Sequence, residues 1–215
     1  MSFDPQTSDL KRLFTNPRMF DSAEYWEDTG FRIIRDSKTK ILVASHRSAD
    51  GYLFKKYTNR VRLNEQLARL KRRVEGAQKL RSLIAEKHLC HIVVPQKWLR
   101  ELPSEFARHG IPSYVLIVER CPILDNDDSE SEHKDIDESI LRELCVVVYS
   151  CTNLDFTARN APFTKRGQIA FIDTEYLEWN TSKSRSKYLE IAGKYVRGRR
   201  LDFVKRMWEE LSHGA

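Results

Sequence analysis

Residues 153–176 read "NLDFTARNAPFTKRGQIAFIDTEY", in which Asp155, Asn160 and Asp173 follow one another at spacings of five and thirteen residues. Between the last two, "KRG" is a turn signal, and the apolar run "IAFI" predicts a short buried strand that ends at Asp173. A polar loop that leads into a buried strand would explain the pattern by structure alone. Carboxylate and amide oxygens gathered around one loop would also suit a divalent metal ion and phosphate groups.

The composition describes a globular chain with a basic surface. The 215 residues are 40% hydrophobic and 10% aromatic, which is enough for a sizeable core in one domain or two small lobes. The net charge of +6 favours anionic partners such as nucleotides, acidic proteins or nucleic acid. Crossing a bilayer takes about 20 consecutive apolar residues, and the sequence holds no such run, so we expect no membrane span.

The four cysteines point to free thiols. None belongs to a C-x-x-C pair, so the chain is expected to fold in a reducing, cytoplasmic compartment without a disulfide framework. The run "HLCH" (88–91) lacks a second ligand pair at zinc-finger spacing, and we expect no zinc site there. The cysteines are Cys90, Cys121, Cys145 and Cys151.

The hydrophobic pattern upstream of the opening stretch predicts an α+β lobe. Three β-rich runs with short connections suit antiparallel neighbours, and two further short runs follow downstream. Between them, apolar residues at helical spacing predict one long amphipathic helix over residues 59–86. We therefore expect a five-stranded antiparallel sheet with the helix inserted after the third strand. The five expected strands are 31–36, 41–46, 51–57, 91–95 and 113–120.

The remaining sequence divides at an acidic segment. Residues 125–138, "DNDDSESEHKDIDE", are rich in charge and serine and are predicted to be a linker. After it, residues 136–150 predict a buried helix, and apolar positions between Leu201 and Leu211 predict another helix. The expected parts are a lead-in at 1–28, a lobe with a hinge at 29–124, the linker at 125–138 and a shorter helical lobe at 139–215.

This order of elements resembles the protein-kinase superfamily. In that family a catalytic loop carries D-x4-N, and a metal-binding Asp follows at the end of a short strand. Asp155 and Asn160 have that spacing, and Asp173 ends "IAFID". The resemblance covers roughly residues 30–176 and implies a two-lobed protein-kinase-like fold, with a five-stranded antiparallel N-lobe sheet, a long helix and a truncated helical C-lobe. In size the chain is similar to the minimal kinase-like effectors that some bacteria deliver into eukaryotic hosts.

The resemblance implies catalytic roles for individual residues. Lys55 in "YLFK" matches the third-strand lysine that pairs with the nucleotide phosphates, with Lys56 as the alternative one register away. Glu75 on the long helix would hold that lysine, and Glu65 is the weaker alternative. Asp155 would orient the acceptor hydroxyl and take its proton.

The same resemblance implies ATP and Mg²⁺, or Mn²⁺, as cofactors. Asn160 and Asp173 would be the metal ligands, because phosphoryl transfer needs oxygen groups that hold a cation against the nucleotide phosphates. The run "LIVERC" (116–121) matches the strand that leads into the hinge. There the backbone of Glu119 and Cys121 would bind adenine.

Several family features are altered in this sequence. Asn153 stands two positions before Asp155, where the family often has histidine, and "TEY" follows Asp173 in place of Phe-Gly. No G-x-G-x-x-G lies between Phe31 and Lys55, and the 42 residues after Asp173 contain no Ala-Pro-Glu. A full helical lobe does not fit in that length, and a pseudokinase stays open as an alternative.

We expect an ATP- and Mg²⁺-dependent phosphotransferase, a minimal protein kinase acting on protein hydroxyls, in the cytoplasm or after delivery into a host cell. The alternatives are a pseudokinase that binds a partner and a phosphotransferase for small molecules. Nucleic-acid binding is not expected. The basic run 59–81 has no interleaved aromatic residues, and its apolar stripe identifies it as a packed helix.

Overall fold

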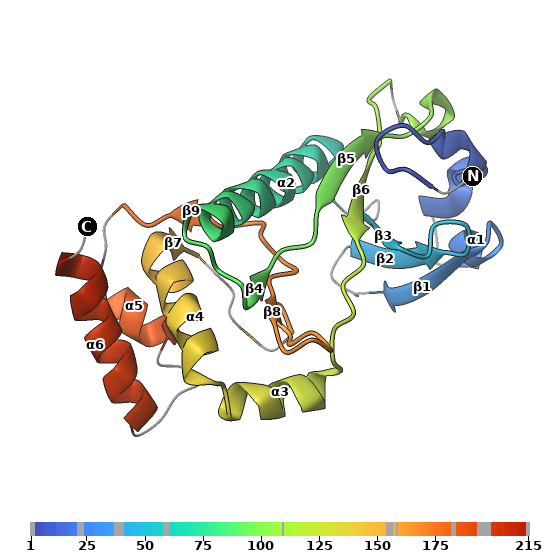
Figure 1. Ribbon diagram of the computed structural model, residues 1–215. Coiled ribbons are helices and arrows are strands. Elements are labelled where there is room, and N and C mark those ends of the chain that lie inside the picture. Colours follow the sequence, from blue (N-terminus) through green and yellow to red (C-terminus); the bar gives the residue numbers. More distant parts are fainter. Residues whose placement is uncertain are drawn as a thin grey trace. The chain divides into compact units, whose positions relative to one another are not determined.

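The computed structural model is an α+β protein with a five-stranded antiparallel sheet and several helices (Figure 1). The chain forms two compact units. Unit 1 comprises Met1–Val74 and Gln96–Arg120, and unit 2 comprises Glu75–Pro95 and Cys121–Ala215. The residues that the structure describes are 3–20, 24–36, 41–57, 61–108, 110–153, 157, 159–181, 184–192 and 199–213.

Unit 1 contains the five-stranded antiparallel sheet that the sequence predicts. Its strands lie in the order β1-β2-β3-β6-β5, so the first three strands form a meander and β6 pairs with β3. Alternate residues of β2 are buried, as expected for a strand with one face on a core. The strands are β1 (Phe31–Asp36), β2 (Ile41–His46), β3 (Tyr52–Tyr57), β6 (Tyr114–Glu119) and β5 (Lys97–Glu101).

The fifth strand of this sheet is not the one that the sequence predicts. The expected strand at 91–95 is in fact β4 (Ile92–Val93), which pairs in parallel with β8 (Ile169–Ala170) of unit 2. The sheet is completed instead by β5, an edge strand beside β6. The apolar run ends at Pro95, which has no N–H to donate to a ladder, while β5 carries charged residues that are typical of an edge.

The N-terminal lead-in packs on one face of the sheet. Phe14 contacts the rings of Trp26, Phe31 and Phe54, with ring centroids 5.1–6.0 Å apart. All four side chains are buried, so the lead-in is part of the core of unit 1. It forms two 3₁₀ turns, η1 (Leu10–Arg12) and η2 (Pro17–Phe20), and the short helix α1 (Glu24–Glu27).

The opposite face of the sheet packs against α2 (Leu63–Glu86), which confirms the predicted long helix after the third strand. Leu70 of α2 is fully buried against Leu116 and Val118 of β6, and Val74 packs at the margin of this cluster. The apolar stripe of the helix therefore decides which of its faces meets the sheet. The predicted first residues of the helix, 59 and 60, lie outside the described residues, and the helix begins at Leu63.

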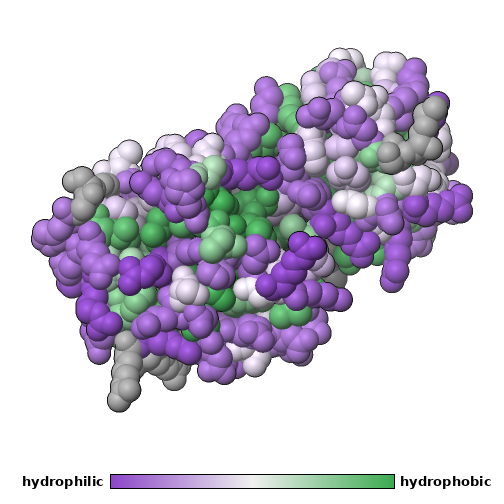
Figure 2. Space-filling model, in the orientation of Figure 1, coloured by the Kyte–Doolittle hydropathy of each residue, from purple (hydrophilic) through white to green (hydrophobic). Residues whose placement is uncertain are grey.

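Unit 2 is built around α4 (Glu138–Ser150), the buried helix that the sequence predicts. Helix α6 (Arg199–His213) lies beside it in Figure 1 and buries Val204 and Trp208 against it. The outer side of α6 is charged, and the surface over it is mostly hydrophilic in Figure 2. The other elements of unit 2 are α3 (Asn126–Lys134), β7 (Cys151–Thr152), β8, β9 (Glu178–Trp179) and α5 (Arg185–Ala192).

The segment predicted as an acidic linker contains helix α3. Asp125 caps it by accepting a hydrogen bond from the backbone N–H of Asp128. The helix buries two polar side chains, Ser129 and His133, which a low count of apolar residues does not reveal. Ile136 is buried as well, so this segment belongs to the core of unit 2.

Helix α2 ends in a Schellman motif. The N–H of Leu89 donates to the carbonyl of Ile84 at 3.0 Å, and the N–H of His88 donates to Ala85. Leu89 and Ile84 both pack on the core of unit 2. His88 takes the left-handed backbone position that usually holds glycine, with φ of 52°.

Replacing this residue by glycine should therefore stabilise the protein. His88→Gly relieves the left-handed conformation, and we expect the free energy of unfolding to rise by about 0.5–1 kcal/mol in urea titration. His88→Val, with a branched Cβ at the same φ, should lower it. A loss of stability in His88→Gly would contradict this reading of the helix end.

Gly76 lets α2 approach the backbone of unit 2 closely. A Cβ at this position would stand 2.1 Å from the carbonyl oxygen of Thr174, so no side chain fits without movement of the backbone. Thr174 is itself buried and directly follows Asp173. The glycine is thus required by packing and not by helix propensity, which would favour alanine.

Gly76→Ala should destabilise the protein although alanine is the better helix former by about 1 kcal/mol. We expect overpacking to outweigh that gain and to lower the free energy of unfolding by about 1–3 kcal/mol, measured by urea titration. The matched control is Gly51→Ala, because a Cβ at Gly51 meets no atom within 4 Å. Equal stability of the two variants would show that α2 does not need this contact.

Candidate functional site

The opening stretch of the sequence forms a hairpin. The N–H of Ile172 donates to the carbonyl of Asn160 at 3.0 Å, and the N–H of Ala170 donates to Pro162 at 2.8 Å. The turn at the far end contains Gly167 with φ of 73°, where glycine avoids the strain of a side chain. The "KRG" turn signal and the following strand are thereby confirmed.

This hairpin brings Asn160 and Asp173 together. Because Asn160 pairs with Ile172, the residue next to Asp173, both residues stand at the open end of one hairpin. Both residues are half-buried. One carboxylate oxygen of Asp173, Oδ1, accepts the N–H of Glu175 at 3.2 Å, which fixes the turn that follows the strand.

Helix α2 lies directly against this end of the hairpin. The Gly76 and Thr174 contact places the helix backbone beside the residue that follows Asp173. Glu75 is exposed and precedes Gly76, so the helix turn that carries Glu75 is held at the turn after the hairpin.

Helix α3 supports the hairpin from a different side. The Nε2–H of His133 donates to the carbonyl of Ala161 at 2.9 Å, and the N–H of Phe163 donates to the hydroxyl of Ser129 at 2.9 Å. The imidazole also meets the Phe163 ring edge-on, with centroids 4.9 Å apart. Since Ala161 follows Asn160, these contacts fix the backbone on which Asn160 stands.

Burial lowers the pKa of His133, although its hydrogen bond to Ala161 acts in the other direction. A histidine pKa that is lower in the folded protein means that folding favours the neutral ring. Its contribution to stability is therefore complete above the unfolded pKa, about 6.5, and is lost as the pH falls below that value.

His133→Phe should remove both the hydrogen bond and the titration. We expect the variant to be less stable by about 1–3 kcal/mol at pH 7.5, because the Ala161 carbonyl loses its buried donor. The difference from the wild type should shrink as the pH falls from about 6.5 towards 5, measured by urea titration at each pH. A difference that does not depend on pH would rule out this role for the imidazole.

The two lysines of β3 differ in burial, since Lys55 is half-buried and Lys56 is fully buried. Lys55 pairs with Leu116 and thus shares the face on which Leu70 of α2 packs. Lys56 is buried and donates from Nζ to Oε1 of Gln66 at 2.6 Å. Burial, together with the nearby guanidinium of Arg108, lowers the pKa of Lys56 to about 8.

The other residues implicated by the resemblance fall in different parts of the chain. Glu119 ends β6, and its backbone N–H donates to the carbonyl of Gln96 at 2.9 Å. The carbonyl of Cys121 accepts the N–H of Ile123. Glu65 forms an ion pair with Arg69 within α2. Asp155 lies outside the described residues.

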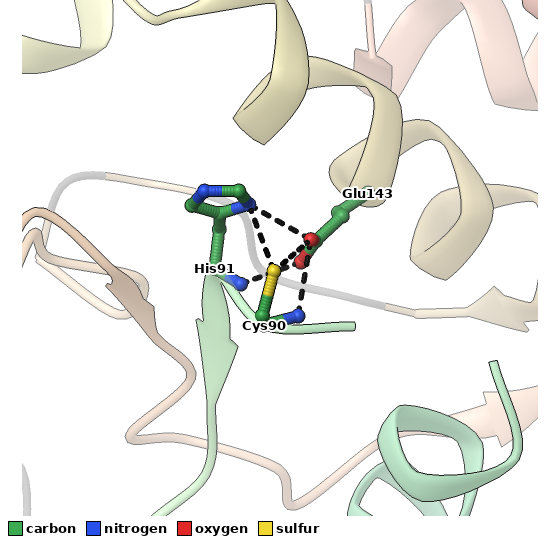
Figure 3. Close-up of side chains that lie close together, drawn as sticks. All are labelled: Cys90, His91 and Glu143. Carbon is green, nitrogen blue, oxygen red and sulfur yellow. Dashed lines mark hydrogen bonds and ion pairs between the residues drawn. The ribbon is translucent and has the colours of Figure 1, made fainter. Parts of the chain in front are cut away.

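A second polar cluster, which the sequence did not predict, joins Cys90, His91 and Glu143. Figure 3 shows Glu143 reaching from α4 towards the two neighbouring residues before β4. Burial acts to raise the pKa of Glu143, but hydrogen bonds from the N–H groups of Cys90 and His91 outweigh it, and the pKa is lowered. The pKa of the Cys90 thiol is raised, first of all by its hydrogen bond to Glu143.

One signal in the sequence could have indicated this cluster. Glu143 lies three residues after Ile140 and four before Val147, two apolar residues of the predicted buried helix, so it flanks the apolar stripe of that helix. A carboxylate at such a position needs a partner.

Comparison with models of known protein families gave no match, and comparison with curated protein sequences gave none either. Within the described ranges, no helix combines the length and the apolar character needed to cross a bilayer.

Proposed function

We propose that the chain is an ATP-dependent phosphotransferase that uses Mg²⁺ or Mn²⁺, with a two-lobed protein-kinase-like fold, and that it acts on protein hydroxyls. The observation that carries this proposal is the hairpin that brings Asn160 and Asp173 to one end. Their order and spacing are those of the two metal-binding residues in the family that the sequence resembles.

The residues at the hairpin end fit a hard divalent cation. Both offer oxygen atoms, and both are half-buried at a backbone position that two hydrogen bonds define. Mg²⁺ is commonly held by one or two protein groups together with phosphate oxygens and water, so this pair is sufficient. When bound, the cation would neutralise charge on the nucleotide phosphates.

Two features of the fold support the same proposal. The sheet order and the long helix after the third strand agree with the N-lobe that the resemblance implies. For contact with phosphates we keep Lys55, with Lys56 as the alternative, because Lys56 is buried and its Nζ donates to Gln66. Glu75, Glu119 and Cys121 keep the roles that the resemblance gives them.

Asp173→Asn tests the proposal most directly, because it keeps the volume of the side chain and removes its charge. With purified protein, labelled ATP, Mg²⁺ and a eukaryotic lysate, we expect transfer of label to protein to fall by about 100-fold or more. Asn160→Ala should lower it in the same way. Transfer that persists in Asp173→Asn would overturn the assignment.

The matched control is Asp202→Asn. Asp202 is an exposed carboxylate on α6 that pairs with Lys205 of its own helix, so its loss should leave transfer unchanged. Circular dichroism of each variant checks that the fold is intact. Label that is transferred to small molecules of the lysate, and not to protein, would identify the chain as a small-molecule phosphotransferase instead.

A pseudokinase is the second candidate, and one observation favours it. Thr174 and Glu175 are buried where the family has Phe-Gly, so the turn after Asp173 lacks the freedom that glycine gives. In that case ATP at 100 times its Kd should still stabilise the fold by about 2.7 kcal/mol, and no label should be transferred. If ATP neither stabilises the fold nor transfers label to protein, both kinds of nucleotide site are excluded.

A further inference from the structure

Three side chains with different metal-ligand atoms converge at the start of β4. The distance from Nδ1 of His91 to Oε1 of Glu143 is 2.8 Å, and that from Sγ of Cys90 to the same oxygen is 3.2 Å. Sγ of Cys90 lies 3.6 Å from Nδ1 of His91. Figure 3 shows the three groups pointing towards one another.

The backbone explains how two neighbouring residues face one acceptor. In an extended strand, adjacent side chains point to opposite sides, but Cys90 and His91 lie in a bend after the Schellman motif of α2. Glu143 fixes this bend, since Oε1 accepts the N–H of Cys90 at 3.0 Å and Oε2 accepts the N–H of His91 at 2.7 Å.

These distances are close to those in a zinc site. Zinc bonds of about 2.0–2.3 Å at tetrahedral angles place the ligand atoms about 3.3–3.6 Å apart. The distance of 3.6 Å between Sγ of Cys90 and Nδ1 of His91 already has this length. The distance from Sγ of Cys90 to Oε1 of Glu143 is only slightly shorter. The distance between Nδ1 of His91 and Oε1 of Glu143 needs to increase by a few tenths of an ångström. Cys90 is exposed, which leaves the fourth position to a water molecule.

We propose that Cys90, His91 and Glu143 bind Zn²⁺. A thiolate, an imidazole and a carboxylate form a mixed set of ligands that zinc accepts and that Mg²⁺ and Ca²⁺ do not favour. On binding, the S–H bond of Cys90 breaks, its proton goes to solvent and a zinc–sulfur bond forms. His91 binds through Nδ1 as the neutral ring with its hydrogen on Nε2, and Glu143 binds through Oε1 while Oε2 keeps the N–H of His91.

Zinc at this position would link three elements of unit 2, namely α4, the start of β4 and, through hydrogen bonds, the start of β8. The carbonyl of His91 accepts the N–H of Ile169 at 2.8 Å, and the carbonyl of Cys90 accepts from Nε2 of Gln168 at 2.9 Å. The metal would thus join α4 to the residues that hold the start of β8. Its role is structural, and it does not depend on the proposed phosphotransferase activity.

Cobalt substitution tests the site. Metal-free protein, prepared with a chelator and titrated with Co²⁺ under reducing conditions, should bind one equivalent and show the near-ultraviolet charge-transfer band of a cobalt–thiolate bond. Zn²⁺ should displace Co²⁺ and raise the melting temperature. Cys90→Ser should abolish the charge-transfer band. His91→Ala and Glu143→Gln should each weaken Co²⁺ binding by about tenfold or more, because even the loss of a residue that hydrogen-bonds to a metal ligand has an effect of that size.

Two matched variants control for other thiols and imidazoles. Cys121→Ser removes another thiol of unit 2, and His88→Asn removes the nearby histidine while it keeps a residue that tolerates the left-handed backbone. Both should bind Co²⁺ as the wild type does. Absence of stoichiometric binding, or a band that survives in Cys90→Ser, would overturn the proposal and leave the cluster as a hydrogen-bonded link between α4 and β4.

Discussion

The missing side chain at Gly76 is the constraint on which the architecture of unit 2 depends. It allows the backbone of α2 to touch the carbonyl of Thr174, and that contact holds the turn after Asp173 against a rigid helix. The hairpin from Asn160 to Ile172 then has one end anchored by α2 and its backbone supported by α3. The candidate metal ligands therefore stand on regular, well-packed structure, which is what a precise site requires.

The same helix contributes to two separate cores. Leu70, in its first half, packs in the core of unit 1, and Leu80 and Leu83, in its second half, pack in the core of unit 2. A single apolar stripe is long enough for both because α2 has 24 residues. Substitutions along this stripe are therefore expected to affect different units according to their position.

Much of the fold could be predicted because it depends on local patterns. The strands β1, β2, β3 and β6, the helices α2 and α4 and the hairpin turn all follow from hydrophobic spacing and turn residues in the sequence. The fifth strand could not be predicted in this way, since "KWLRE" carries charges and only its pairing with β6 makes it a strand. Helix α3 was hidden for a similar reason, because the side chains it buries are Ser129 and His133.

The candidate functional residues likewise include some that the sequence predicts and some that only the structure reveals. The spacing of Asn160 and Asp173 is a local property, and the hairpin brings the two residues together. Glu143, by contrast, is more than fifty residues from Cys90 and His91 in sequence, so only the packing of α4 reveals the cluster. Lys55 and Lys56 are equivalent in the sequence, and only the structure shows that Lys56 is the fully buried one.

The parallel pairing of β4 with β8 has a consequence for synthesis. Ile92 and Val93 leave the ribosome long before Ile169 and Ala170, their partners. At ordinary elongation rates of about 5–20 residues per second, the nascent chain exposes the second half of α2 for several seconds. During that time its leucines lack the part of their core that β8 and the later residues supply, so this apolar surface stays exposed while the chain is being made.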